Sequence, residues 1–173
     1  SRKMNDLVAP GALKIAPVKK VHDRGFLEFL ESAWSEWLAA GYRGEILPTM
    51  LPVPGLRRKE VRSIDGKVGY YTFGTETMIT AGTWKAATAS AATAQKGQSL
   101  VSGGDRAAFA LCRPPGHHAH HDLYGGYCFL NNVAIAAQGF LDSGAKRVAI
   151  LDVDFHHGNG TQNIFYGRDD VLF

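Results

Sequence analysis

The sequence predicts an α/β fold built on a parallel sheet, and two observations support this. Segments with helical periodicity alternate along the chain with short apolar segments, which is the order of β-α units. The segment 147–155 is almost continuously apolar, as in a parallel strand covered on both faces. With 173 residues and 45% hydrophobic composition the chain can bury a core, so one domain or a large part of one is expected.

Three segments are expected to be helices: residues 22–40, 83–96 and 132–141. In the first, aromatic and leucine side chains recur at helical spacing, Asp23 can cap the start and Gly41 can end it. The second is rich in alanine and can be capped by Thr80 or Thr83. The third is broken by Asp142-Ser143-Gly144.

The remaining segments are expected to be one long loop and three strands. The proline-rich segment 44–69 is predicted to be irregular, and such loops in compact domains tend to be functional or mobile. Strands are predicted at 106–113, which ends at two prolines and a glycine, and at 147–155. The last residues, 170–173, resemble the opening of a further strand, so the C-terminus is interpreted as a break within a longer protein.

Charge and hydropathy exclude some functional classes. The formal net charge is +3, with 19 Lys+Arg scattered among 16 Asp+Glu. The densest basic cluster, Arg57, Arg58 and Lys59, is interrupted by Glu60 and is expected to be a solvated loop, so nucleic acid is not expected as a partner. No secretion signal or membrane-length apolar segment is present, which makes a cytoplasmic protein without membrane partners the default expectation.

Acidic and histidine side chains gather at the end of the predicted strand 147–155. Asp152, Asp154 and His156 alternate with apolar residues, so they point to one face, at the sheet edge where α/β proteins place their ligands. Two carboxylates held this close repel each other unless a cation joins them. Asp and His donors suit zinc or another divalent transition metal. The alternative is an Asp that caps a turn and a His that satisfies it.

A histidine pair follows the other predicted strand. His117 and His118 come directly after Pro114-Pro115-Gly116, which fixes the backbone at the same sheet edge. Adjacent imidazoles near a metal can act as a general base and a charge-stabilising partner. The alternative is a water-exposed loop pair. The next two histidines, His120 and His121, are expected to line the rim of the site rather than to bind metal.

Glycines crowd at two further places. At Gly125-Gly126 a substrate could approach the backbone, and the following Tyr127 could form the wall of a narrow channel, although an aromatic at such a position is more often part of the core. The segment 158–161 is also rich in glycine, but it lacks the Gly-Lys-Ser/Thr ending of a phosphate-binding loop.

Three segments, 113–118, 126–132 and 151–162, resemble three consecutive motifs of the histone deacetylase family, within the arginase/deacetylase superfamily. The preceding residues are similar to the bacterial acetylpolyamine amidohydrolase branch of that family. This resemblance implies an α/β, three-layer fold with a central parallel sheet. Residues 1–173 would be the amino-terminal part, about the first half, of a single deacetylase-like catalytic domain.

The resemblance also implies roles for the residues at the predicted sheet edge. Asp154 and His156 match two zinc ligands, and Fe²⁺ or Co²⁺ could replace Zn²⁺. Asp152 matches the carboxylate that orients His117, the electrostatic partner, while His118 matches the general base. Asn159 stands where class I deacetylases carry Asp, which places the chain with the class II and bacterial branch.

Substrate contacts, a second ion and a dimer are implied as well. Gly126 matches a residue whose carbonyl accepts the substrate amide N–H, and Tyr127 matches an aromatic channel wall. Glu76 and Asp65 lie in a segment that, in the polyamine branch, narrows the entrance at a homodimer contact and offers negative charge to a cationic substrate. The implied residues of a structural K⁺ site are Asp152, Asp154, His156, Phe165, Arg168 and Val171.

The activity implied by the resemblance is zinc-dependent removal of acetyl groups from acetylated polyamines. A class II-type protein lysine deacetylase acting on acetyl-lysine remains the alternative, followed by a non-catalytic binding module that keeps the fold. A dinuclear manganese hydrolase would need additional Asp ligands. The third metal ligand and the transition-state tyrosine of the family belong downstream of Phe173, so these residues in isolation are predicted to be inactive.

Overall fold

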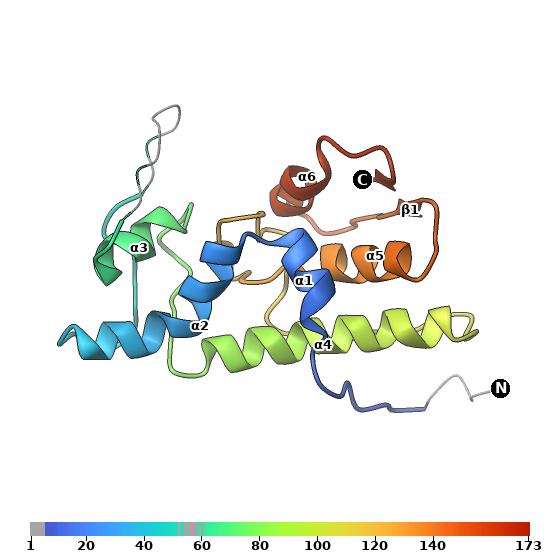
Figure 1. The fold of residues 1–173 in the computed structure, drawn as a ribbon, viewed down its shortest axis with the longest axis horizontal. Helices are drawn as coiled ribbons and strands as arrows, with labels where there is room; N and C mark the ends of the chain where they lie inside the picture. The colour runs from blue at the N-terminus through green and yellow to red at the C-terminus, as the bar shows by residue number, and fades with distance from the viewer. Residues whose placement is uncertain (1–5, 52, 54–58, 60) are drawn as a thin grey trace.

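The computed structural model describes residues 6–51, 53, 59 and 61–173. Its elements, in chain order, are α1 (Ile15–Val21), α2 (Arg24–Ala39), α3 (Ile64–Tyr70), α4 (Thr83–Ser102), α5 (Asn132–Asp142), β1 (Val148–Ala149), α6 (Asn159–Phe165) and β2 (Val171–Leu172). Figure 1 shows α4 running along the molecule, with α2 and α3 at one end and α5, β1 and the C-terminus toward the other. Arg57 and Arg58 of the predicted basic loop lie outside the described residues.

The predicted helices are confirmed with small changes in their bounds. The Asp23 carboxylate caps α2 by accepting a hydrogen bond from Phe26 N at 3.1 Å. The helix then buries an apolar face that includes Phe26, Phe29 and Leu30. The alanine-rich helix α4 is longer than predicted, and its small side chains pack closely against α5.

Three helices, α1, α3 and α6, were not predicted, and α3 corrects the expectation that the segment 44–69 is irregular throughout. Helices α1 and α3 have seven residues each, about two turns, so they show little periodicity. In α1, Pro17 lies in the first turn, where a missing N–H costs nothing. In α3, Gly69 packs against the backbone of Met50, since an added Cβ would lie 2.6 Å from the Met50 carbonyl oxygen.

The predicted strands are mostly wrong for this chain. Residues 106–113 form no strand, and only Val148–Ala149 of the segment 147–155 is one. It pairs in parallel with β2, which confirms the strand expected at the C-terminus. The two apolar segments do not pair with each other, and both line a cavity of about 520 Å³, one with Ala108 and Ala110 and the other with Ile150 and Leu151.

Exposure explains why these segments are not strands. Phe109 is 89% exposed, Val153 87% and Phe155 96%, whereas Val148 and Ile150 pack against the core, so the described residues cover only one face of the apolar run in part. A strand exists only when neighbours take up its N–H and C=O groups. The apolar pattern predicts burial correctly only where such neighbours are present.

The core lies beside the loop that carries the histidine pair. Phe29 stacks on Tyr71 with ring centroids 4.8 Å apart, and Tyr124 stacks on Phe129 at 5.7 Å. Tyr124 N also donates to the Tyr71 carbonyl at 2.8 Å, which ties the segment after the histidines to the end of α3. Among the described residues, none of the helices combines the length and apolar character needed to cross a bilayer.

Candidate active site

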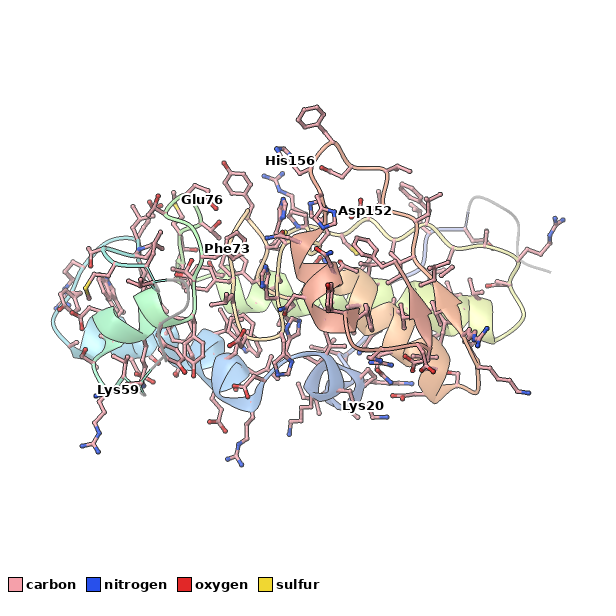
Figure 2. All side chains as sticks on the ribbon, turned by 90° about the horizontal axis from the view of Figure 1, so that it is seen from above. Lys20, Lys59, Phe73, Glu76, Asp152 and His156 are labelled. Atoms are coloured by element: carbon pink, nitrogen blue, oxygen red, sulfur yellow. The ribbon has the colours of Figure 1, made fainter. Side chains whose placement is uncertain are left out.

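The acidic segment after β1 forms a ladder of hydrogen bonds between alternate residues. Asp152 Oδ1 accepts from Asp154 N at 3.1 Å, and Asp154 Oδ1 accepts from His156 N at 2.8 Å. These bonds are turns in a segment that is not a strand, so they match the capped-turn alternative for Asp152 and Asp154, and the shared face that alternation along a strand predicts stays a prediction. Figure 2 shows Asp152 and His156 along one edge of the molecule, on the same side as Glu76.

Asp154 and His156 present a pair of donors that fits a divalent metal. His156 Nδ1 lies 3.4 Å from Asp154 Oδ1. Two ligands at ~2.0–2.2 Å in a tetrahedral zinc site would lie roughly 3.4 Å apart. The hydrogen bond from His156 N lowers the pKa of Asp154, so its carboxylate is ionised and ready to bind a cation. Among the described residues, no group of three or more His, Cys, Asp and Glu completes a metal site.

His117 is paired with the first carboxylate of the ladder. Its Nδ1 lies 2.8 Å from Asp152 Oδ2, and because a carboxylate only accepts, Nδ1 carries the proton. Both side chains are largely covered, 15% and 21% exposed. Gly158 packs against this pair, since an added Cβ would lie 2.6 Å from Asp152 Oδ2. The water-exposed loop alternative for His117 is therefore wrong.

His118 has a different partner. Its Nδ1 lies 2.6 Å from Asn159 Oδ1, and its ring centroid is 4.1 Å from that of His117 and 5.9 Å from that of His156. The start of α6 holds this loop, because Gly160 N and Thr161 N donate to the His117 carbonyl at 3.0 and 3.1 Å. The structure thus brings both histidines and Asn159 to the predicted metal ligands.

The Gly126–Tyr127 turn forms another wall of the site. Both residues have positive φ, 55° and 62°. Glu76 Oε1 accepts from Gly126 N at 2.8 Å, and Thr77 Oγ1 accepts from Tyr127 N at 2.8 Å. The first of these bonds lowers the pKa of Glu76, so the carboxylate is ionised. Tyr127 is 64% exposed, so it is a surface residue beside the site and not part of the core.

Comparison with known proteins identifies the family. The family model for the histone deacetylase domain matches residues 2–173. This chain belongs to the histone deacetylase family.

Relatives in this family include several acetylpolyamine amidohydrolases. The chain is 56% identical to acetylpolyamine amidohydrolase from Mycoplana ramosa over 169 residues, which is 98% of this chain and 50% of that protein. It is 56% identical over 170 residues to acetylpolyamine amidohydrolase 2 from Pseudomonas aeruginosa, covering 98% of this chain and 49% of the relative. The chain therefore spans about half the length of the curated relatives it matches.

The solved structures agree with this assignment. The crystal structure of acetylpolyamine aminohydrolase from Burkholderia pseudomallei matches with a TM-score of 0.84 and 42% identity, over 92% of this chain and 46% of that chain. The HD domain of HDA15 matches with a TM-score of 0.71 and 27% identity, over 96% and 38%. The predicted α/β fold class and the family resemblance are confirmed.

Some predicted residues of this deacetylase-family site lie elsewhere or remain untested. Asp65 lies in α3, at the end of the molecule away from β1 in Figure 1, and its expected place at a dimer-built entrance stays a prediction. Phe165, Arg168 and Val171 follow one another from α6 to β2. The Arg168 guanidinium there donates two bonds to Asp170 at 2.8 and 2.7 Å. Their assignment to a K⁺ site stays a prediction.

Three residues that support the site were not predicted. Thr77 holds Tyr127, and no pattern in the sequence indicated it. Asn131 caps α5 by accepting from Ala134 N at 3.0 Å and also donates to the Ala119 carbonyl at 3.0 Å. An Asn just before a helical segment is a capping signal that could have revealed it. His22, predicted to begin a helix, instead lies buried between α1 and α2 and is 1% exposed.

Replacing Gly126 with alanine is expected to lower kcat about 10²-fold, since misplacing a catalytic group by about 1 Å costs this much. The positive φ disfavours a side chain, and an added Cβ would collide with the His118 ring. Steady-state kinetics of the full-length protein would measure the effect. Gly167→Ala, where a Cβ meets open space, is the matched control, and an equal loss in both variants would contradict the prediction.

Because His22 is buried, we expect the free energy of unfolding of the protein to fall in acid. Its Nε2 accepts from Asn131 N and its Nδ1 bonds the His120 carbonyl, both at 2.9 Å, so the buried ring is neutral. Burial lowers its pKa from 6.5 to about 4. The unfolded chain therefore binds the proton first, and the stabilisation is complete above about pH 6.5 and lost as the pH falls toward about 4.

We expect this protonation to lower the free energy of unfolding by roughly 3 kcal/mol across that range, because each tenfold difference in proton affinity between the folded and unfolded chain corresponds to about 1.4 kcal/mol. Urea unfolding of the wild type and of His22→Gln at several pH values would measure it. The variant removes the titrating group, so its stability should fall less. Parallel pH dependence in the two proteins would show that other groups are responsible.

Proposed function

We propose that this protein is a metal-dependent amidohydrolase that removes acetyl groups from acetylated polyamines. The observation that carries the proposal is the arrangement of two oriented imidazoles, His117 on Asp152 and His118 on Asn159, beside the Asp154/His156 donor pair. The shared family and the names of the acetylpolyamine amidohydrolase relatives support it. Of the metals considered, Zn²⁺ suits the Asp and His donors, with Fe²⁺ or Co²⁺ as alternatives.

The position of the proton on His118 indicates how the acetamide would be hydrolysed. When bound, the divalent cation supplies Lewis acidity toward the acetamide carbonyl and its attacking water. Because His118 donates from Nδ1 to Asn159, its Nε2 is free to accept a proton from that water. The water oxygen bonds to the carbonyl carbon, the C–N bond breaks, and His118 returns the proton to the leaving amine. Acetate and the free amine are the products.

His117 and Gly126 have supporting roles in this scheme. The Asp152 carboxylate accepts from His117 Nδ1 and so fixes the orientation of the His117 ring, which matches the electrostatic partner of the reacting carbonyl in the family. The Gly126 carbonyl accepts the substrate N–H, and the exposed Tyr127 ring forms a wall of the substrate channel. K⁺ bound through Asp152, Asp154, His156, Phe165, Arg168 and Val171 would stabilise the segment that carries these ligands.

Glu76 favours a polyamine as the substrate. Its carboxylate is ionised and lies on the Gly126–Tyr127 turn, where it can attract the ammonium groups that remain on an acetylated polyamine. The choice of a polyamine is tested by comparing kcat/KM for acetylputrescine and acetylspermidine with that for an acetyl-lysine peptide, using the full-length, zinc-loaded protein. At least a tenfold preference for the acetylated polyamines is expected.

A protein lysine deacetylase is the second candidate. Histone deacetylase HDA1 from Saccharomyces cerevisiae is 46% identical over 79 residues, so proteins named as histone deacetylases share part of this sequence. A strong preference for the acetyl-lysine peptide in the same comparison would favour this candidate and overturn the polyamine assignment. The homodimer and the cytoplasmic location expected from the sequence stay predictions.

A further inference from the structure

The Asn159 side chain lies between two imidazoles of the histidine-rich loop. Its Oδ1 is 2.6 Å from His118 Nδ1, and its Nδ2 is 3.1 Å from His120 Nε2. His118 and His120 are two residues apart, and Asn159 is the first residue of α6. One amide therefore joins the histidine pair of the proposed site to a third histidine outside it.

The amide couples the proton positions of the two rings. Its oxygen only accepts and its nitrogen only donates. In the observed orientation, His118 must carry a proton on Nδ1 and His120 must have an unprotonated Nε2. If the amide were rotated by 180°, Nδ2 would face His118 Nδ1, and the His118 proton would have to move to Nε2. That nitrogen could then no longer accept a proton.

His120 is held in place to make this contact. Its ring packs against Phe73 with centroids 5.2 Å apart. Its backbone N–H donates to the Leu123 carbonyl at 2.9 Å, and its backbone carbonyl accepts from the His22 ring at 2.9 Å. Partial burial lowers the pKa of His120, so the ring is neutral at pH 7. A charged ring would carry a proton on Nε2 and oppose the Asn159 amide group.

We propose that His120 is a positioning residue: by accepting from Asn159 Nδ2, it selects the amide orientation that leaves His118 Nε2 free. The sequence suggested only a rim position for His120. The inference rests on the proposed function in its assumption that His118 accepts a proton. Because His120 acts through Asn159 and not on substrate, it should affect kcat and leave KM nearly unchanged.

Three variants of the full-length, zinc-loaded protein separate the hydrogen bond from ring packing. His120→Phe keeps an aromatic ring against Phe73 but removes the acceptor, and kcat should fall about tenfold, at the lower end of the range for residues that orient metal-site groups. His120→Gln restores an acceptor and should recover at least half of the wild-type kcat. Phe73→Leu removes the ring contact but keeps the acceptor, so its kcat should fall clearly less than that of His120→Phe.

An imidazole ¹⁵N spectrum of the wild type tests the proton positions without any turnover. His118 and His120 should both be protonated on Nδ1 and unprotonated on Nε2, and in His120→Phe the His118 signal should shift toward a mixture of tautomers. A wild-type His120 protonated on Nε2, an unchanged His118 tautomer in His120→Phe, or an equal loss of kcat in Phe73→Leu would overturn the inference. If the wild type does not hydrolyse acetylated polyamines, the proposed function fails, while the spectrum still decides the role of His120.

Discussion

Replacing Asp154 with alanine is expected to remove the bound divalent cation and to lower kcat/KM by about 10³-fold. The carboxylate is one of the two donors that the described residues bring within ligand spacing, at 3.4 Å from His156 Nδ1. A metal that polarises a carbonyl stabilises the transition state by several kcal/mol, and about 1.4 kcal/mol corresponds to a factor of ten in rate. Losing that stabilisation therefore accounts for the expected decrease.

The measurement needs two readouts on the full-length protein. Elemental analysis gives the metal content after gel filtration, and initial rates on acetylputrescine give kcat/KM. Glu31→Ala is the matched control, because it removes one exposed carboxylate from α2 and should change neither quantity. If Asp154→Ala keeps one equivalent of zinc, Asp154 is not a ligand.

The helices show what local sequence can predict. In α2, Asp23 supplies the cap and the apolar side chains recur over four turns, so the signal is both repeated and local. The bounds of α5 could be predicted for the same reason. Helix α1 offers only seven residues and carries Pro17, which resembles a helix breaker although it is tolerated in the first turn.

The strands show what local sequence cannot predict. Phe109, Leu111 and Val153 form an apolar pattern that indicates burial in a sheet, but they are 89%, 74% and 87% exposed. Strand formation depends on partners that are distant in sequence, and pairing with β2 reaches only Val148 and Ala149. An apolar pattern shows that a segment is suited to burial in a sheet. The described residues do not bury these side chains here.

The candidate site was predictable where its residues share one segment. Asp152, Asp154 and His156 are two residues apart in sequence, and each carboxylate accepts from the backbone N–H two residues later. Contacts between segments were not predictable from spacing, since Glu76 meets Gly126 and Asn159 meets His120 only after folding. Local patterns therefore suggested the candidate residues, while the contacts that orient them required the three-dimensional structure.

Asp152→Asn is expected to lower kcat about 10³-fold while the metal content stays near the wild-type value. Asp152 accepts two hydrogen bonds, from His117 Nδ1 at 2.8 Å and from Asp154 N at 3.1 Å. An asparagine has one accepting oxygen, so either orientation of its amide sets an N–H group against one of these donors. In addition, His117 loses the carboxylate that orients its ring, and comparable loss of a histidine-orienting carboxylate costs about 10⁴-fold in a serine protease.

The control for this variant is a second Asp→Asn change where one acceptor is sufficient. Asp23 caps α2 through a single bond to Phe26 N, and asparagine caps helices as well as aspartate, so Asp23→Asn should keep full activity and stability. If Asp152→Asn retains its kcat, His117 does not depend on a charged partner, and charge stabilisation must come from other groups in the site. If it instead loses the metal along with the activity, then Asp152 acts mainly by fixing the Asp154 backbone, because its bond to Asp154 N is the contact that links it to the metal ligands.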